Sequence, residues 1–362
     1  MAKKSLLLVG GGKIGECISA LFSQADDYEL TVVDRDERLL AGLAGMVKET
    51  RVIDAAHPAA LAKLAAGKFA VLSAAPFYLT PAIATAAKEA GAHYFDLTED
   101  VASTRTVKAL AEGANTAFVP QCGLAPGFIS IVAHDLTRGF DSLRDVQMRV
   151  GALPIYPTNA LKYNLTWSTD GLINEYCNPC EAIIDGEMRE TLPLEEIERF
   201  SLDGLEYEAF NTSGGLGTLC ETLEGKVENL NYKTVRYIGH RDIMKMLLRD
   251  LRLMQRRDLL KDVLETAVPI TKQDVVLVFV TVAGVRHGNL DQTTFARKLY
   301  SREIAGRHFS AIQVTTASGI CAMVDLVAQG KLPGKGMVRQ EQATLAAFQE
   351  NRFGANYLKA AA

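Results

Sequence analysis

The chain has no apolar run that approaches the roughly eighteen residues needed to span a membrane, and it has no surplus of positive charge. Its 39 basic and 43 acidic residues give a net charge of −4, so we expect neither a nucleic-acid nor a membrane partner. The first twelve residues, MAKKSLLLVGGG, have only a four-residue apolar run before the glycines, which is too short for a signal sequence. We therefore expect a cytoplasmic protein.

Cysteine is sparse and scattered, with six residues in 362. The only CxxC motif joins Cys177 and Cys180, and it has neither a second cysteine pair nor a nearby histidine. A zinc site normally needs four such ligands, and a redox motif is expected beside a βαβ unit. The sequence therefore predicts no metal site and reduced thiols.

The stretch Leu6–Gly15 carries the strongest functional signal. Four apolar residues predict a buried strand, which runs into Gly10-x-Gly12-x-x-Gly15 and then a helix. Gly10 permits the tight turn, Gly12 lets a pyrophosphate approach the backbone, and Gly15 lets the helix lie close to the strand. The amides of Lys13 and Ile14 at the helix start would face the phosphates. We infer a dinucleotide site.

The next predicted strand, 29–33, ends at Asp34, which follows Gly15 by 19 residues. A carboxylate at this place accepts hydrogen bonds from the adenosine ribose and repels a 2′-phosphate. NAD is therefore the expected cofactor. Because Arg35 beside Asp34 can attract a 2′-phosphate, NADP is left open.

The first third alternates strand and helix, which predicts a Rossmann-type, doubly wound parallel sheet. Further strands are expected at 50–53, 69–74, 93–97 and 117–119, with helices at 36–47, 58–67, 80–91 and 103–113. Ligands of such sheets lie beyond the carboxyl ends of the strands. The residues expected on this rim are Asp34, Asp54, Ala74, Ala75, Tyr78, Asp96, Gly123 and Ala125.

After a predicted helix at 128–140, segments in which apolar and polar residues alternate indicate a second α+β domain with a largely antiparallel sheet. Its strands are expected near 146–154, 161–169, 181–191, 234–239, 275–284 and 308–316, with helices at 242–251 and 255–267. We place the cofactor domain at 1–123 and the substrate-binding domain at 124–314, and a C-terminal helical segment at about 315–362 can return to the first. The open sheet of a second domain is often covered by a twin, so a homodimer or larger homo-oligomer is expected.

Four irregular blocks occur in order: GLAPGF, YNLTWSTDGLINEY, EAFNTSGGLGTL and NYKTVRYIGHRD. On these blocks the chain resembles the saccharopine dehydrogenase-like family, and within it the lysine 6-dehydrogenases most of all. The resemblance implies a Rossmann domain, a second domain with the substrate site, a dimer or larger assembly, and NAD-dependent oxidation of an amino acid. Saccharopine-forming relatives carry an acidic residue and a cysteine where this chain has Ala125 and Val150.

A dinucleotide enzyme of this kind must remove a proton from an amine whose pKa is near 10.4 before hydride can leave. His240 can act near neutral pH, although it can equally cap a helix. Asp96 can accept the proton if burial raises its pKa, or it can hold an ammonium ion if it stays ionised. Tyr78 can pass a proton or line the pocket.

Arg236 is the expected carboxylate-binding residue, because it alternates with aromatic and aliphatic neighbours on a predicted strand. Its anion is either the α-carboxylate of a substrate or a glutamate of the chain, such as Glu221, Glu224 or Glu228. The segment Asn211, Thr212 and Ser213, earlier in the chain, has small polar side chains that could form hydrogen bonds to the polar end of a ligand. Trp167 is either a core anchor or a pocket wall.

Three functions stay open. The first is NAD-dependent oxidation of lysine at its ε-carbon, which releases ammonia and gives a semialdehyde that cyclises. The second is a saccharopine dehydrogenase, which needs a further cation such as Lys162, Lys233 or Arg241 for the extra carboxylates. The third is a dinucleotide-binding regulator without turnover.

Overall fold

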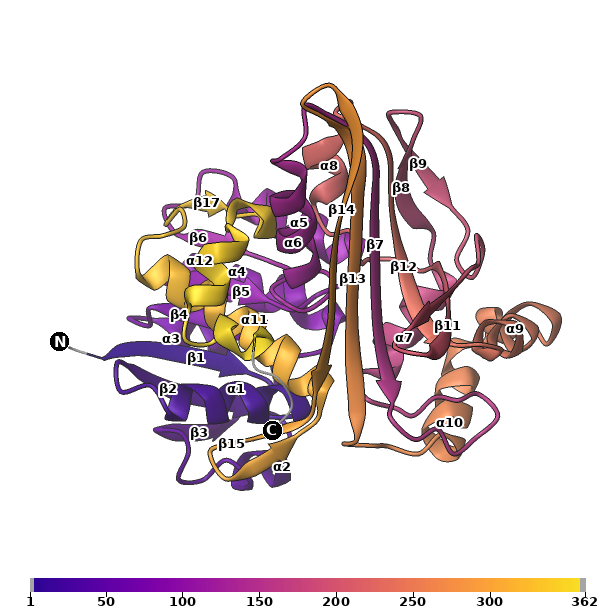
Figure 1. Cartoon of the computed structure of the whole chain (residues 1–362). Coiled ribbons are helices and arrows are strands. Elements are labelled where there is room, and N and C mark those ends of the chain that lie inside the picture. The colour runs from indigo at the N-terminus through magenta and orange to yellow at the C-terminus, as the bar shows by residue number, and fades with distance from the viewer. Residues whose placement is uncertain (1–2, 359–362) are drawn as a thin grey trace. The chain divides into compact units, whose positions relative to one another are not determined.

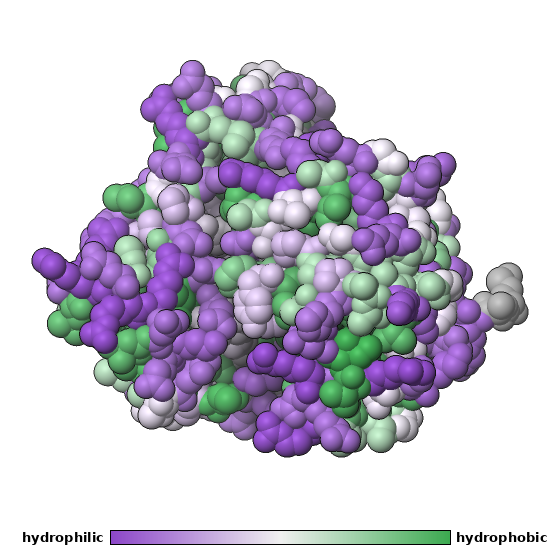
Figure 2. Space-filling view, turned by 180° about the vertical axis from the view of Figure 1, so that it is seen from behind, coloured by the Kyte–Doolittle hydropathy of each residue, from purple (hydrophilic) through white to green (hydrophobic). Residues whose placement is uncertain are grey.

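The computed structural model describes residues 3–358, which form two compact units (Figure 1). Unit 1 contains residues 3–131, 303–309 and 313–358, and unit 2 contains residues 132–302 and 310–312. Polar residues predominate on the face seen in Figure 2, with hydrophobic residues in small separate groups.

Unit 1 is built on a seven-stranded, fully parallel sheet with the order β17-β6-β5-β4-β1-β2-β3. The strands are β1 (Lys4–Val9), β2 (Tyr28–Asp34), β3 (Glu49–Val52), β4 (Ala70–Ser73), β5 (His93–Asp96), β6 (Ala117–Val119) and β17 (Gly336–Met337). The predicted Rossmann-type sheet is confirmed. Its seventh strand comes from far along the chain.

Helices connect these strands: α1 (Lys13–Ser23), α2 (Glu37–Ala41), α3 (Pro58–Ala65), α4 (Thr80–Ala90), α5 (Val101–Ala111) and α6 (Phe128–Thr137). Side chains of β1, β4 and β6 pack with α3, α4 and α5 in one buried cluster that includes Leu7, Val71 and Phe118. The helix expected at 36–47 is shorter than predicted. It ends at Ala41, since Gly42 follows as its C-cap and Gly45 has a positive φ of 84°.

Unit 2 contains an eight-stranded mixed sheet with the main order β10-β11-β12-β7-β13-β14, and β8 and β9 branch from β12. The strands are β7 (Ser142–Pro154), β8 (Cys180–Ile184), β9 (Glu187–Thr191), β10 (Glu198–Leu202), β11 (Leu205–Asn211), β12 (Val227–Tyr237), β13 (Asp274–Arg286) and β14 (Asn289–Tyr300). Only the β7–β12 pair is parallel among these neighbours, so the largely antiparallel second sheet is confirmed.

The helices of unit 2, apart from α8 (Leu219–Leu223), pack on one buried cluster that includes Tyr163, Tyr176 and Phe210. The others are α7 (Thr169–Cys177), α9 (His240–Lys245), a π-helical turn (Met246–Asp250), a 3₁₀ turn (Leu253–Gln255) and α10 (Arg257–Ala267). The strand predicted at 161–169 is wrong. This segment is irregular, since Lys162 has a φ of 51° and the Asn159 side chain holds the backbone of Tyr163 at both its N–H and its carbonyl.

The prediction of a strand through 308–316 is wrong beyond Phe309. The short strands β15 (Arg302–Ile304) and β16 (Arg307–Phe309) pair, and α11 (Ala311–Ala328) then begins. The carboxylate of Asp274, which is fully buried at the start of β13, accepts hydrogen bonds from the N–H groups of Ala311 and Ile312. A cap supplied from a distant strand starts this helix, so the local pattern could not show where it begins.

Within residues 3–358, α11 is the one helix whose length and mean hydropathy of 1.5 would suit a membrane span. Of its residues, 89% are buried inside the fold. Its polar groups face partners in the same unit: Asn356 donates to the Ser318 hydroxyl, and Asn351 donates to Asp325. These features are those of a core helix. The chain ends, in the described part, with β17, a 3₁₀ turn (Gln340–Gln342), α12 (Leu345–Glu350) and a 3₁₀ turn (Gly354–Tyr357).

Candidate dinucleotide and substrate sites

The glycine turn of unit 1 has the close contacts that the motif requires. Gly10 has a φ of 108°, and a Cβ there would lie 2.7 Å from the carbonyl oxygen of Ala74. A Cβ on Gly15 would overlap the carbonyl oxygen of Gly10. At Gly12, by contrast, a Cβ would meet nothing within 4 Å, and α1 has no side-chain cap. The backbone beside the helix start at Lys13 and Ile14 is therefore open to a phosphate-bearing ligand.

Asp34 lies at the carboxyl end of β2, where its carboxylate holds this turn. Its Oδ2 accepts a hydrogen bond from the N–H of Gly11 at 2.7 Å, and its Oδ1 accepts one from Asp36 at 2.9 Å. Arg35 is exposed next to it. Asp34 and its surroundings therefore fit the adenosine end of a dinucleotide. The hydrogen bond from Gly11 positions the Asp34 carboxylate beside the glycine turn that would approach the phosphates.

The remaining rim residues of unit 1 differ in exposure. Ala74 and Ala75 follow β4 directly, and the Ala74 N–H donates to the Val9 carbonyl beside the glycine turn. Asp54 is exposed and its Oδ1 accepts the Ala56 N–H, which is a local turn contact. Tyr78 is 58% exposed and contacts Phe77 edge to face.

The turn containing Gly123 and Ala125 lies between β6 and α6 and is closely packed. A Cβ on Gly127 would overlap the Gly123 carbonyl, and one on Gly319 of α11 would overlap the Cys122 carbonyl. The sequence pattern showed the turn but not the helix that lies against it.

Asp96 is 1% exposed and supports this turn from below. Its Oδ1 accepts hydrogen bonds from the N–H groups of Thr98 and Gln121, at 3.0 and 2.8 Å. Asp96 Oδ2 and the buried Tyr94 hydroxyl are both without a hydrogen-bond partner of ordinary geometry among the described residues. Burial raises the pKa of Asp96 to about 6, although the two backbone donors oppose the rise.

Arg236 lies on β12 in unit 2, with 2% of it exposed, and makes no ion pair with a carboxylate of the described chain. Its Nε donates to the Tyr176 hydroxyl at 2.9 Å, and its Nη1 donates to the Val235 carbonyl at 2.9 Å. The guanidinium also lies over the rings of Tyr163 and Tyr176, at 4.9 and 5.9 Å from their centroids. The glutamates proposed as internal partners do not pair with it.

His240 continues this row of hydrogen bonds. Its Nδ1 lies 2.8 Å from the Leu161 carbonyl, which can only accept, so Nδ1 carries the proton. Nε2 then accepts from the Tyr176 hydroxyl at 3.0 Å. Burial, with the charge of Arg236 as a second cause, lowers the pKa of His240 to about 3. The imidazole is therefore neutral at physiological pH.

The other predicted substrate residues use side-chain hydrogen bonds or packing within unit 2 to stabilise the fold. The Thr212 and Thr234 hydroxyls share a hydrogen bond of 2.7 Å, and Ser213 donates to the Pro179 carbonyl. Asn211 donates to the Thr191 hydroxyl at 3.3 Å. Trp167 is partly buried against the core cluster of Tyr163 and Tyr176, as expected for a core anchor.

The three residues named as candidate cations for the extra carboxylates of saccharopine already have partners within the chain. Lys233 contacts Glu198 at 2.8 Å, and Arg241 contacts Glu195 and Asp242 at 3.1 and 2.7 Å. Lys162 donates to the Ile238 carbonyl. Cys177 and Cys180 are free, buried thiols whose pKa values are raised by burial, so they stay protonated.

Tyr163 and Tyr176 were missed as site residues by the sequence analysis. They are the first and last residues of the block YNLTWSTDGLINEY, and both lie against Arg236. The aromatic residues at the two ends of that block were therefore the available signal. The Leu161 carbonyl could not be found in this way, because backbone acceptors leave no trace in side-chain patterns.

A parallel Rossmann sheet with this glycine turn, joined in one chain to a mixed sheet holding a buried arginine, defines a dinucleotide-binding oxidoreductase. Two family models match the chain: the saccharopine dehydrogenase NADP binding domain over residues 6–117 and the saccharopine dehydrogenase C-terminal domain over residues 123–353. The chain belongs to the saccharopine dehydrogenase family. Its cofactor class is a nicotinamide dinucleotide.

Solved structures show the same fold. Apo histidine-tagged saccharopine dehydrogenase (L-Glu forming) from Saccharomyces cerevisiae matches with a TM-score of 0.77 at 17% identity, over 93% of this chain and 94% of the other. The DAP dehydrogenase of C. glutamicum in complex with DAP matches with a TM-score of 0.51 at 12% identity, over the full length of both chains. At such identities the likeness concerns the fold alone.

Proposed function

We propose that this protein is an NAD-dependent lysine 6-dehydrogenase. The ε-carbon of L-lysine gives up a hydride, water adds to the resulting imine, ammonia leaves, and the 6-semialdehyde cyclises onto the α-amino group. Each turnover to the semialdehyde consumes one lysine, one oxidised cofactor and one water, and releases one semialdehyde, one ammonia, one reduced cofactor and one proton. Cyclisation of the semialdehyde then releases one water.

The observation that carries this proposal is the buried, unpaired charge of Arg236. A guanidinium is costly to bury without an anion, and a bidentate carboxylate is its best partner. No carboxylate of the described chain lies within ion-pair distance of Arg236, although the buried Glu175 acts on its charge from further away. We therefore assign the α-carboxylate of the substrate as the anion that contacts the guanidinium. The Tyr176 hydroxyl accepts the Nε–H and the Val235 carbonyl accepts one N–H of Nη1, so the remaining N–H groups of Nη1 and Nη2 are assigned to the ligand.

The charge balance of unit 2 favours lysine over saccharopine. Lysine brings one carboxylate, for which one unpaired arginine suffices, whereas saccharopine brings three. Lys233 and Arg241 are neutralised by the chain's own carboxylates, and each buried carboxylate without a partner would cost several kcal/mol. Ala125 and Val150 also lack the acidic residue and the cysteine of saccharopine-forming relatives.

The dinucleotide, when bound, supplies the hydride acceptor, and Gly10, Gly12, Gly15 and Asp34 would hold it. For the proton of the substrate ammonium we retain His240, Asp96 and Tyr78 as candidates. His240 is neutral, but its Nε2 lone pair is directed at Tyr176. Asp96 is mostly ionised at neutral pH, so it can accept a proton or hold an ammonium. We propose NAD as the preferred cofactor because of Asp34.

The test incubates the protein with NAD and with L-lysine or saccharopine, while following reduced cofactor, ammonia and glutamate. We expect ammonia and reduced cofactor in equal amounts from lysine, with little turnover of saccharopine. Glutamate from saccharopine, with lysine inert, would establish the second candidate, a saccharopine dehydrogenase, the activity after which both matching family models are named. Tight NAD binding without turnover of either amino acid would indicate a non-catalytic regulator.

We further propose a homodimer in the cytoplasm. Strands β10 and β14 form the two ends of the main strand order of unit 2, and an open sheet edge or face is a common place for a second copy. Light scattering coupled to size exclusion would test this, and a mass of one chain across micromolar concentrations would contradict it.

A further inference from the structure

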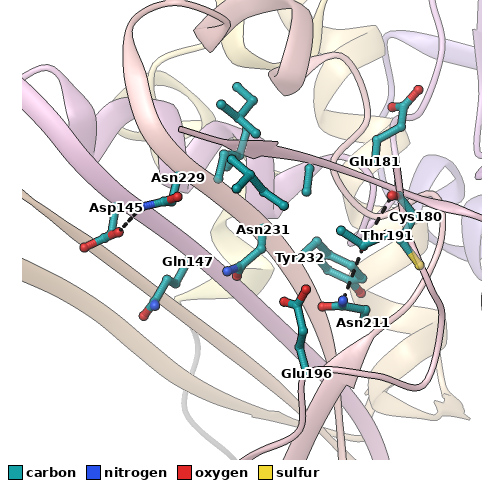
Figure 3. Close-up of a pocket in the computed structure, with 14 residues that line it drawn as sticks. Asp145, Gln147, Cys180, Glu181, Thr191, Glu196, Asn211, Asn229, Asn231 and Tyr232 are labelled. Carbon is teal, nitrogen blue, oxygen red and sulfur yellow. Dashed lines mark hydrogen bonds between the residues drawn. The ribbon is translucent and has the colours of Figure 1, made fainter. Parts of the chain in front are cut away.

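A cavity of about 310 Å³ opens in unit 2 where β8 leaves β12. These strands pair through one residue pair only, Leu230 with Ile183, so they separate on either side of it. The cavity is lined by residues of β7, β8 and β12 and of the segment before β10 (Figure 3). Its volume is at the lower end of the range that small-molecule sites occupy.

The wall of this cavity holds hydrogen-bond acceptors that have no partner among the described residues. Neither polar atom of the Asn231 amide makes a hydrogen bond, and its Oδ1 is fully buried. Asn211, 3% exposed, uses its Nδ2 on Thr191, whereas its Oδ1 accepts nothing. A buried amide oxygen such as Asn231 Oδ1 normally accepts a hydrogen bond, so this wall suits a ligand that donates one.

The charged side chains that line the cavity are all carboxylates, of which Asp145 is ion-paired at 2.6 Å with Arg144, a residue outside the lining. The nearest cation to the Glu196 carboxylate is the Lys233 ammonium, 3.9 Å from Oε2, and that ammonium lies closer to Glu198, at 2.8 Å. Asp145 lies at the other end of the labelled polar row in Figure 3, hydrogen-bonded to Asn229. No lysine or arginine is among the described residues that line the cavity.

An aliphatic wall completes the cavity, formed by side chains that include Ile183 and Leu230. A group that fits must therefore donate several hydrogen bonds, carry positive charge and continue into a short alkyl chain. A primary ammonium meets all three conditions, because it has three N–H donors and no acceptor.

We propose that this cavity is a binding site for a primary alkylammonium ion, separate from the carboxylate site at Arg236. The head group is held by Glu196, Asn211 and Asn231, and the alkyl chain lies against Ile183 and Leu230. The site also has a direct connection to the row around Arg236. Asn211 precedes Thr212, whose hydroxyl is hydrogen-bonded to Thr234 on β12, two residues before Arg236.

The test is isothermal titration calorimetry of the full-length protein with n-pentylammonium chloride, which has no carboxylate for Arg236. We expect saturable binding with one site per chain. Tetramethylammonium, with the same charge but no N–H donor, and 1-pentanol, with the same chain but no charge, should each bind at least tenfold more weakly.

Matched variants locate the site. Glu196→Gln should weaken pentylammonium about fivefold or more, which is the upper range for a half-exposed ion pair. Glu206→Gln removes the same charge from an exposed position of β11 outside the cavity and should leave binding unchanged. Asn231→Leu, which removes acceptors and no charge, should also weaken binding. Melting curves will show that each variant is folded.

Arg236→Lys separates this proposal from the proposed function. Pentylammonium binding should be unaffected in that variant, even if lysine oxidation is lost. Equal affinity for tetramethylammonium, binding that survives both Glu196→Gln and Asn231→Leu, or binding abolished by Arg236→Lys would each overturn the proposal.

Discussion

The Nε–H of Arg236 donates to the Tyr176 hydroxyl oxygen at 2.9 Å, and this bond sets the direction of the bonds that follow. The Tyr176 O–H must then donate to His240 Nε2, and His240 Nδ1 to the Leu161 carbonyl. A single arrangement of protons satisfies all three contacts. The arginine is thus held in place by a tyrosine and a neutral histidine rather than by a carboxylate.

Replacing Tyr176 with Phe should destabilise the protein. The change leaves Arg236 Nε and His240 Nε2 buried without partners, and each such group costs about 1–3 kcal/mol. Tyr163→Phe is the matched control, because the buried Tyr163 hydroxyl makes no hydrogen bond of ordinary geometry while its ring also lies against Arg236. Urea unfolding of both variants measures the difference, and equal free energies of unfolding would contradict this account.

Arg236→Lys should raise the Michaelis constant for the amino acid by tenfold or more. A lysine ammonium keeps the charge but cannot form two parallel hydrogen bonds to a carboxylate, and disrupting a buried charge pair costs about 2–5 kcal/mol. Lys162→Ala serves as the control, since Lys162 is exposed and should matter little if the substrate has one carboxylate. An unchanged Michaelis constant in Arg236→Lys would reduce the residue to a structural role.

Asp34→Ala should shift cofactor preference toward NADP by about tenfold or more, since a negative charge within a few ångströms of the 2′-phosphate is removed. Asp54→Ala offers a comparison on the same rim, because the exposed Asp54 carboxylate accepts only a local backbone N–H. The measurement is the ratio of kcat/KM for NAD and NADP. Equal efficiency with both cofactors in the parent protein, unchanged in Asp34→Ala, would refute the assignment.

Asp96 should give the folded protein a measurable pH dependence. Its pKa is raised from 3.8 to about 6, so the folded state binds this proton more tightly than the unfolded state does. Its contribution is therefore most favourable below pH 4, declines as pH rises from about 4 to about 6, and is constant above that range. The loss approaches about 3 kcal/mol at most.

The comparison of Asp96→Asn with the parent protein isolates this effect. The free energy of unfolding of Asp96→Asn, relative to the parent, should rise between pH 4 and pH 6.5. Asp100→Asn keeps an N-capping side chain on α5 and should show no such trend. A flat difference for Asp96→Asn over this range would show that the carboxyl is not perturbed in this way.

Local signals in the sequence were enough for the Rossmann sheet and its turn. The role of Gly15 depends on a contact with Gly10 within one strand–turn–helix unit, and Asp34 on the next strand accepts a hydrogen bond from Gly11. Gly10 is required by its positive φ and also by its approach to Ala74 after β4, which the motif alone does not show. The substrate side depended on pairs far apart in the chain. Arg236 was found because an arginine stands out among apolar neighbours, whereas its partner Tyr176, 60 residues away, looked like any core aromatic. The start of α11 was misjudged for the same reason, because its cap is the distant Asp274.

The place of β17 has a consequence for the order in which the protein is made. Gly336 and Met337 pair with Ala117 and Phe118 of β6, so one edge of the parallel sheet is complete only when the C-terminal segment arrives. A ribosome must therefore synthesise all of residues 132–302 before the cofactor unit can close. Until then the outer side of β6 is an unpaired edge, a known route to intermolecular association. The parallel sheet of the nascent cofactor unit can therefore be completed only after residues 132–302 and the segment that contains β17 have been synthesised.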